Sequence, residues 1–176
     1  KYQLRSRDAY HLFIMLEIDI LPDGSLALPN DAFEYIDASI VSIHSSFRMD
    51  KKTMTNRILK GLSHPKAKIL AHPTGRLIGR RVGYDLDWKE IFLYCKKYHK
   101  ALEINASPMR LDTPDYVVFE AIKQGVKFVI NTDAHEKTQM DMMEHGVSVA
   151  RRGWAQKSDI LNTMGYNDLV RWLFNP

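Results

Sequence analysis

The chain has 176 residues, of which 45% are apolar and 26% charged, so it can bury its own core and is not of the disordered class. It contains no apolar run of the roughly 18 residues that a membrane span needs. Its first residues do not show the charged region, apolar run and small-residue cleavage site of a signal peptide. The net charge of +4 is compatible with a phosphate-bearing partner, and a lone cysteine excludes an intrachain disulfide. We expect a single cytoplasmic domain over residues 1–176 that does not bind membranes.

Apolar segments and helix-like segments alternate along the chain. The segments predicted as strands are 11–20, 37–44, 67–72, 101–106 and 127–135, with 145–150 as a sixth. Three predicted helices begin at Asn30, Asp87 and Thr113. Three more are predicted at 55–62, 159–164 and 166–174. Nearly continuous apolar strands joined by short helical connections are typical of a parallel sheet with crossover helices. The sequence therefore predicts an α/β fold.

Polar side chains recur at or near the carboxyl ends of the first five predicted strands. They are Glu17, His44, His72, Asn105, and Asp133 together with His135. In parallel α/β architectures these ends lie on one rim, where functional sites form. Three imidazoles and two carboxylates suit Zn²⁺, Mn²⁺ or Fe²⁺ better than Ca²⁺ or Mg²⁺. We therefore predict a metal centre formed by Glu17, His44, His72, Asp133 and His135.

The stretch VINTDAH, residues 129–135, allows two interpretations by itself. If the strand continues through it, Asp133 and His135 project from the same face, because strand side chains alternate. In the alternative, the stretch is a turn in which Asp133 bonds local backbone amides. The matching pattern at the other strand ends favours the metal interpretation.

A basic segment, HPTGRLIGRR at 72–81, follows the third predicted strand. Its guanidinium groups belong to Arg76, Arg80 and Arg81, and Arg110 follows the fourth strand. Arginine matches phosphate geometry with two parallel donors. Taken alone, each arginine is better explained by a surface ion pair than by a contact with a ligand. Because all of them follow strand ends, we predict that these four residues contact phosphate or DNA at the same rim.

The other chemistry-bearing residues are interpreted as structural. Cys95 lies on an apolar helix face and is predicted to be a small core residue. The remaining histidines, His11, His64, His99 and His145, are not predicted to bind metal.

The motifs LEIDILPDGSL, VSIHSSF, LAHPTGRLIGRR, LEINASPMRLD, INTDAH and VARRGW, in this order, resemble the PHP (polymerase and histidinol phosphatase) domain. More narrowly, they resemble the PHP domain at the C-terminus of bacterial and archaeal family X DNA polymerases. The resemblance implies a distorted seven-stranded (β/α) barrel with three metals at its carboxyl rim. It also implies that Glu17 bridges two metals, that His44 and His72 bind one of them, and that Asp133 and His135 serve the others.

The resemblance also has a gap. The family's barrel opens with a His-x-His strand and two further histidines, which this sequence lacks. The chain therefore resembles the C-terminal part of a PHP domain, a partial barrel without its first strands. We expect the fragment alone to be weak or inactive, and we expect its open sheet edges to favour self-association.

By resemblance, the expected activity is a metal-dependent 3′–5′ exonuclease, usually supported by Mn²⁺, that processes DNA ends beside an upstream polymerase domain. Glu17 and Asp133 are the expected catalytic carboxylates, since paired cations held by carboxylates clamp the oxygens of a phosphoryl displacement. Two alternatives remain open. One is a phosphatase of small molecules of the histidinol-phosphatase type, and the other is a non-catalytic module that binds DNA or supports the polymerase.

Overall fold

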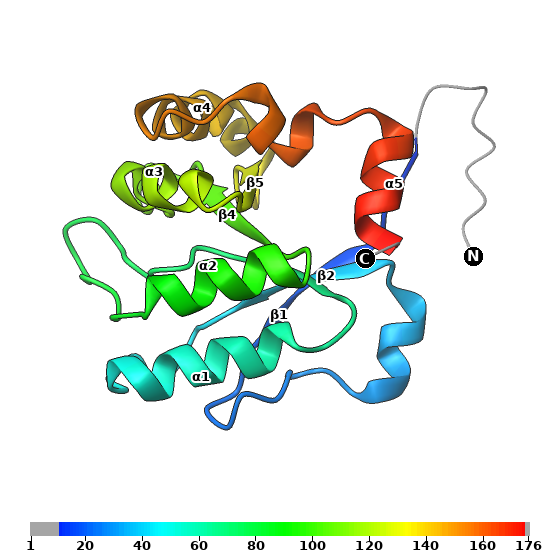
Figure 1. Ribbon diagram of the computed structural model, residues 1–176, viewed down its shortest axis with the longest axis vertical. Helices are drawn as coiled ribbons and strands as arrows, with labels where there is room; N and C mark the ends of the chain where they lie inside the picture. Colours follow the sequence, from blue (N-terminus) through cyan, green and yellow to red (C-terminus); the bar gives the residue numbers. More distant parts are fainter. Residues whose placement is uncertain (1–10, 175–176) are drawn as a thin grey trace.

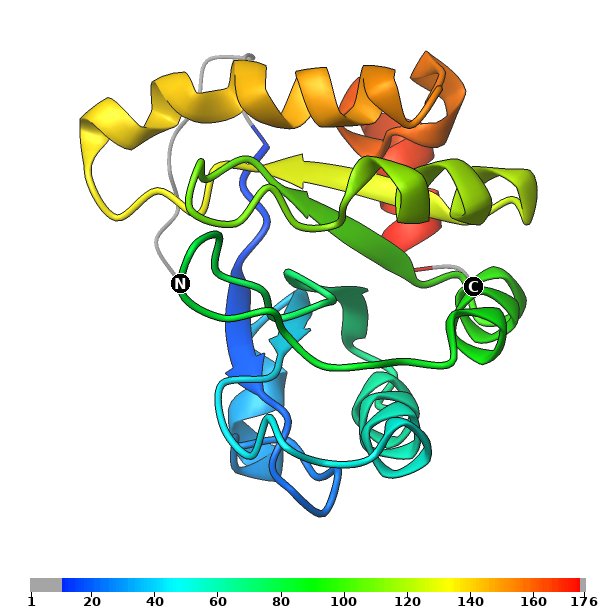
Figure 2. The ribbon, with the colours of Figure 1, turned by 90° about the vertical axis from the view of Figure 1, so that its left-hand side faces the viewer.

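The sheet has five parallel strands that lie side by side in chain order. The computed structural model describes residues 11–174. Its strands are β1 (Met15–Asp19), β2 (Ala38–Ser42), β3 (Ala67–Leu70), β4 (Ala101–Asn105) and β5 (Lys127–Asn131). Figure 2 shows that the sheet twists strongly, so that β1 (blue) and β5 (yellow) run in different directions. The predicted α/β class is confirmed, and the sequential strand order is consistent with part of a (β/α) barrel.

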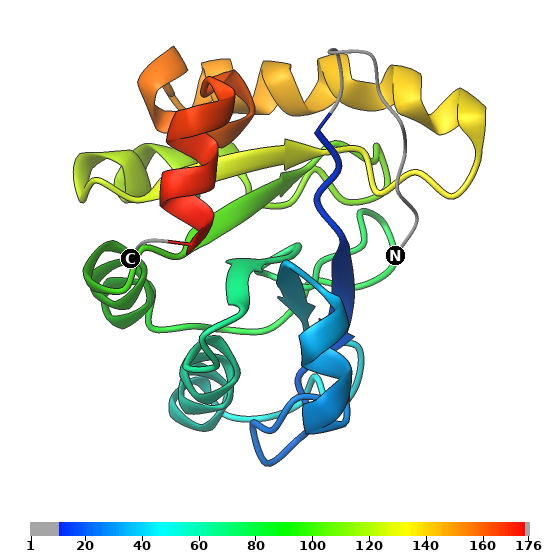
Figure 3. The same ribbon diagram turned by 90° about the vertical axis from the view of Figure 1, so that its right-hand side faces the viewer.

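Helices cover both faces of this sheet. On one face lie α1 (Lys51–Leu62), α2 (Trp88–Lys97), α3 (Asp115–Lys123) and α4 (Met143–Arg152), stacked in a row (Figure 1). The main apolar core fills the space between them and the strands. On the other face lies α5 (Tyr166–Phe174), where Trp172 packs against a smaller cluster that includes Ile69 (Figure 3). Short 3₁₀ segments occur at Asn30–Tyr35, Lys137–Met142, Lys157–Asp159 and Leu161–Thr163.

Aspartate side chains begin two of the helices. Asp50 caps α1 by accepting the Thr53 amide at 3.0 Å, which starts this helix earlier than the predicted 55–62. Asp87 caps α2 as predicted, by accepting the Glu90 amide at 3.2 Å. The predicted cap at Thr113 is wrong, because its hydroxyl donates to the Glu103 carbonyl at 2.6 Å and α3 follows Pro114.

The predicted sixth strand at 145–150 is also wrong, because this segment belongs to α4. Gly146, Val149 and Ala150 are its buried residues, which is helical spacing rather than strand alternation. A side chain at Gly146 would lie 2.5 Å from Ile130, so the glycine lets the helix approach β5 closely. The valines at 147 and 149 imitate a strand in the sequence, and only the packing against β5 decides between the two.

The two edges of the sheet, at β1 and at β5, differ in what lies beside them. Beyond β5, Ile160 forms a bridge with Phe128, and the Asn162 side chain accepts the Ile130 amide at 2.8 Å and donates to its carbonyl at 3.0 Å. Asn162 thus imitates a further strand at that edge. Within residues 11–174, β1 pairs with β2 alone, and the apolar side chains of Leu16 in β1 and of Leu12 and Ile14 just before it are exposed.

Candidate metal centre

Three predicted ligands meet at the carboxyl ends of neighbouring strands. Glu17 is in β1, His44 lies two residues beyond the end of β2, and His72 lies two residues beyond the end of β3. Glu17 Oε1 lies 3.0 Å from His72 Nε2 and 3.4 Å from His44 Nε2. One ligand atom from each residue falls within 4.8 Å of the other two. We call these residues the Glu17–His44–His72 group, and its two imidazoles and one carboxylate fit a borderline divalent cation.

The backbone of His72 is held in an uncommon conformation. Its φ is +28°, in the region that bulky residues rarely adopt. The Glu103 carboxylate accepts its amide at 2.8 Å, and its carbonyl accepts the Gly75 amide at 2.8 Å. Its ring is almost fully buried, and Nδ1 has no partner among residues 11–174. A strained backbone of this kind persists only where surrounding contacts enforce it. With the backbone held in this conformation, the His72 ring faces Glu17.

His44 is held in place by contacts with Asp19 and Ser42. Asp19 Oδ1 accepts the His44 amide at 3.0 Å, and Ser42 Oγ lies 3.4 Å from Nδ1 of the ring. The side chain is about half exposed, at 48%. Contacts at Nδ1 orient an imidazole so that Nε2 is available to a ligand. The centre is therefore open to solvent on the His44 side and closed on the His72 side.

A buried carboxylate that the sequence analysis missed lies behind these residues. Glu103, in the middle of β4, is 4% exposed and accepts hydrogen bonds from the His72 amide and from Asn131 Nδ2 at 2.8 Å. Asn105 Nδ2 lies 3.4 Å from Glu103 and donates to Asp133 Oδ2 at 3.2 Å. Burial raises the pKa of the Glu103 carboxyl, while its amide donors oppose that rise. The signal in the sequence was a lone acid inside the apolar strand ALEIN.

A second buried acid shapes the loop that follows His72. Asp112 is fully buried, and it accepts the Thr74 amide at 3.1 Å and the Thr74 hydroxyl at 2.9 Å. Burial raises the pKa of this carboxyl as well. Together Glu103 and Asp112 fix both ends of the short stretch between His72 and Thr74.

The other two predicted ligands, Asp133 and His135, do not join the Glu17–His44–His72 group in the structure. The strand stops at Asn131, and Asp133 has a φ of +54°, so the expected strand alternation does not extend to this pair. Asp133 faces Asn105 and lies 3.7 Å from Arg110 Nε. The His135 ring is 83% exposed, with Nδ1 2.8 Å from the Asp133 carbonyl. The expected continuation of the strand through this pair is therefore not observed.

The predicted phosphate-binding arginines have different surroundings. The Arg76 guanidinium donates to the carbonyls of Arg110 and Leu111. Arg81 Nε donates to the Gly75 carbonyl at 2.7 Å, and the guanidinium lies over the Phe47 ring. Arg80 is exposed, and Arg110 faces Asp133. Two of the four therefore brace loops, which leaves Arg80 as the most accessible cation of this set.

Acidification should weaken the fold through Glu17. The hydrogen bond with His72 lowers the pKa of the Glu17 carboxyl from 4.5 to about 2, although burial opposes it. The stabilisation is therefore complete above the unfolded pKa and is lost as the pH falls toward the folded one. Since the side chain is 35% exposed, we expect a loss of about 1–2 kcal/mol after solvent screening. Urea unfolding at a series of pH values measures it.

The control for this pH dependence is the Glu17→Gln variant. It cannot titrate, so its free energy of unfolding should fall less steeply than that of the parent between about pH 5 and pH 2. Identical slopes for the two proteins would show that Glu17 does not carry this effect.

The fold and the group together define an α/β protein with a candidate divalent-metal centre at the carboxyl ends of a parallel sheet. No family model matches the chain. The chain is 42% identical over 158 residues, 90% of its length, to the DNA polymerase/3′-5′ exonuclease PolX of Bacillus subtilis. It is 26% identical over 129 residues, 69% of its length, to a probable phosphatase of Caldicellulosiruptor bescii.

These relatives are longer proteins than the matched region. The chain spans 28% of the length of the Bacillus protein and 51% of that of the probable phosphatase. The homology therefore concerns one part of each relative. Among residues 11–174, no helix is long and apolar enough to cross a membrane.

Proposed function

We propose that the chain is part of a PHP-type phosphoesterase domain of a family X DNA polymerase, and that this domain removes nucleotides from DNA 3′ ends. The observation that carries the proposal is the contact of one Glu17 oxygen with Nε2 of both His44 and His72. Support comes from the similarity to a protein named as a polymerase and 3′–5′ exonuclease. Further support is the similarity to a protein named as a probable phosphatase.

The residues of the group fit a divalent cation. One Glu17 oxygen and the two Nε2 atoms that face it give a donor set of the kind that binds Mn²⁺, Zn²⁺ or Fe²⁺. A cation there would supply Lewis-acid polarisation of a phosphate oxygen. Glu17, His44 and His72 would hold it, while Asp133 and His135 lie at the same rim as proposed ligands of further cations.

The chain's own residues have three proposed tasks. Glu17 and Asp133 supply the carboxylates on either side of the reacting phosphate. Arg110, 3.7 Å from Asp133, and the exposed Arg80 supply positive charge for the phosphate oxygens. Asp19 and Glu103 keep His44 and His72 in position through their backbone amides. DNA 3′ ends, the polymerase domain and self-association along the β1 edge are the proposed partners.

A nuclease assay tests the proposal. The complete gene product that contains this chain is incubated with Mn²⁺ and an oligonucleotide with a free 3′ end, beside the variants His44→Ala and Asp133→Ala. We expect loss of at least about 100-fold in cleavage rate for His44→Ala, since a ligand lost from a metal centre costs more than its supporting contacts do. The exposed His145→Ala variant is the matched control. Equal cleavage by all four proteins would reject the proposal.

A phosphatase of small phosphoesters is the second candidate, and the similarity to a probable phosphatase favours it. Hydrolysis of a chromogenic phosphate monoester without cleavage of DNA would select this candidate. DNA binding that ignores chelators, with no hydrolysis of either substrate, would instead select the non-catalytic module.

A further inference from the structure

A large basic cavity lies beside the candidate metal centre, on the loops that follow its two histidines. Its volume is about 1220 Å³, and it is lined by the segment after His44 that includes Phe47 and Lys51 and by the segment from Thr74 to Trp88. The start of α3 adds Tyr116. Sites for single small ligands rarely exceed about 1,000 Å³, so the size suits a stretch of an extended molecule.

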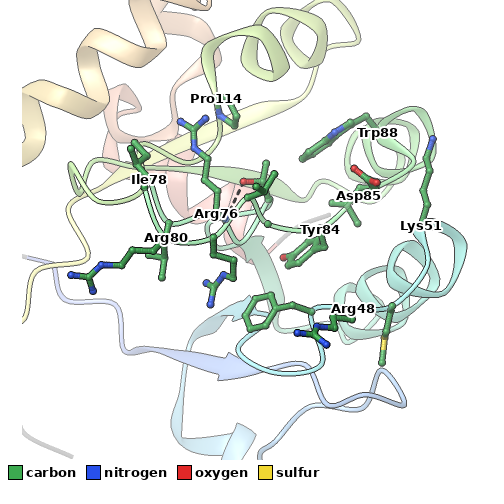
Figure 4. A pocket seen from close by; sticks show the side chains of 18 of the residues that line it. Arg48, Lys51, Arg76, Ile78, Arg80, Tyr84, Asp85, Trp88 and Pro114 are labelled. Atoms are coloured by element: carbon green, nitrogen blue, oxygen red, sulfur yellow. Dashed lines mark hydrogen bonds between the residues drawn. The ribbon is translucent and has the colours of Figure 1, made fainter.

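The charge on the lining is strongly one-sided. Its charged side chains are one carboxylate, from Asp85, against five cations, from Arg48, Lys51, Arg76, Arg80 and Arg81. Figure 4 shows Arg80 at one end of the group and Trp88 with Lys51 at the other. The cations are therefore spread along the cavity instead of meeting at one point, which suits a ligand with several anionic groups in a row.

Aromatic rings share the lining with these cations. Phe47, Tyr84, Trp88 and Tyr116 all line the cavity. Tyr116 is 67% exposed, while the Tyr84 hydroxyl is buried and has no partner among the described residues. Phe47 and Trp88 are partly buried, which leaves Tyr116 as the most exposed of the four rings. Aromatic rings beside a basic groove suit single-stranded nucleic acids, since bases stack on the rings and phosphates follow the cations. An acidic peptide would use the cations and leave the rings unexplained.

Lys51 is the residue that the fold itself does not explain. It is the first residue of α1, followed by Lys52, and the first turn of this helix has no acidic residue. Cations at a helix N-terminus oppose its dipole, so helix stability alone would favour Asp or Glu there. Neither Lys51 nor Lys52 forms an ion pair within residues 11–174, and the difference between them is that Lys51 lines the cavity and Lys52 does not. A contact with an anion at the cavity would account for Lys51.

We propose that this cavity binds a single-stranded segment of nucleic acid, with phosphates along Arg80, Arg48 and Lys51 and a base on Trp88. The inference rests on the proposed function, because the segment would be the part of the strand next to the phosphodiester bond at the metal centre. The loops bearing His44 and His72 form both sites, so one strand can reach from one site to the other.

The test measures binding without hydrolysis. A fluorescein-labelled oligothymidylate of about 12 nucleotides is titrated with the protein in excess chelator, followed by anisotropy at several salt concentrations. We expect Lys51→Glu to weaken binding by about fivefold or more and to reduce the salt slope by about 0.7 per lost phosphate contact. Lys52→Glu makes the same charge change on the same helix turn and should cost less than about twofold.

Thermal unfolding separates binding from folding. Both lysine variants remove a cation from the start of α1, so neither should lower the melting temperature. Trp88→Phe should remove most of the tryptophan quenching that the oligonucleotide causes, because the other tryptophans, Trp154 and Trp172, do not line the cavity. Phe at 88 preserves the apolar packing against Phe92.

Three results would overturn the proposal: equal loss of binding in Lys51→Glu and Lys52→Glu, quenching that survives Trp88→Phe, or displacement of the oligonucleotide by polyglutamate at the same charge concentration. The last result would assign the cavity to acidic peptides. Because the assay contains chelator, its failure leaves metal-dependent cleavage intact. Conversely, binding without cleavage would reject the exonuclease and keep the cavity assignment.

Discussion

Replacing Glu103 with leucine should lower the free energy of unfolding by about 2–5 kcal/mol, one of the largest losses available in this chain. Both oxygens of this carboxylate accept hydrogen bonds, one from Asn131 and the other from the His72 amide. Leucine fills a similar volume but accepts none. The donors would then be buried without partners, and each such group costs about 1–3 kcal/mol. Urea unfolding monitored by circular dichroism measures the loss.

Two further variants make this result specific. Glu103→Gln keeps one acceptor oxygen and should lose less than leucine does. Glu120→Leu, on the exposed face of α3 where Glu120 pairs with Lys123, should change stability by less than about 0.5 kcal/mol. A loss below about 1 kcal/mol in Glu103→Leu would mean that the donors find other partners, and that Glu103 does not hold the His72 backbone.

The strand pattern was readable from the sequence because parallel strands buried on both faces are continuous apolar runs. Each of the five predicted strands contains an observed one, and the placement of Glu17, His44 and His72 follows from their positions at strand ends. Helix starts were readable where a cap is local, as at Asp87. The parallel arrangement of the strands and the Glu17–His44–His72 group could therefore be predicted from the sequence.

Other features depend on contacts between distant segments, which no local pattern reports. Glu103 joins His72 to Asn131, residues 31 and 28 positions away from it. The end of β5 at Asn131, which separates Asp133 from the expected alternation, depends on a backbone with positive φ at Asp133. The helix at 143–152 depends on the fit of Gly146 against Ile130. In each case tertiary packing overrides the periodicity of the sequence.

The guanidinium groups show a third limit of sequence reasoning. A run of arginines after a strand end predicts anion binding. In the structure, however, Arg76 and Arg81 donate hydrogen bonds to backbone carbonyls of the same rim. Arginine serves both purposes with the same fork of donors, so the residue type alone does not distinguish them. At the start of α1 the helix dipole disfavours both Lys51 and Lys52, and only the position of Lys51 on the cavity distinguishes the two.

Addition of Mn²⁺ at about 100 times its dissociation constant should stabilise the protein by about 2.7 kcal/mol, since the cation binds only the folded group. His44→Ala removes one of three ligands and should weaken binding by at least about 100-fold, which leaves a gain of about 0.4 kcal/mol at the same concentration. Because the His44 side chain is 48% exposed, its removal should change the metal-free stability little. Thermal unfolding with and without Mn²⁺ measures both quantities.

The matched control is His145→Ala, which removes an exposed histidine of α4 outside the group. It should keep the full metal-dependent stabilisation. His135→Ala adds a separate question, because that ring is 83% exposed and apart from Glu17. If its gain equals that of the parent protein, the first cation depends on the Glu17–His44–His72 group alone. An undiminished gain in His44→Ala would instead place the cation elsewhere, since no centre held by two imidazoles and a carboxylate survives the loss of an imidazole without a change in affinity.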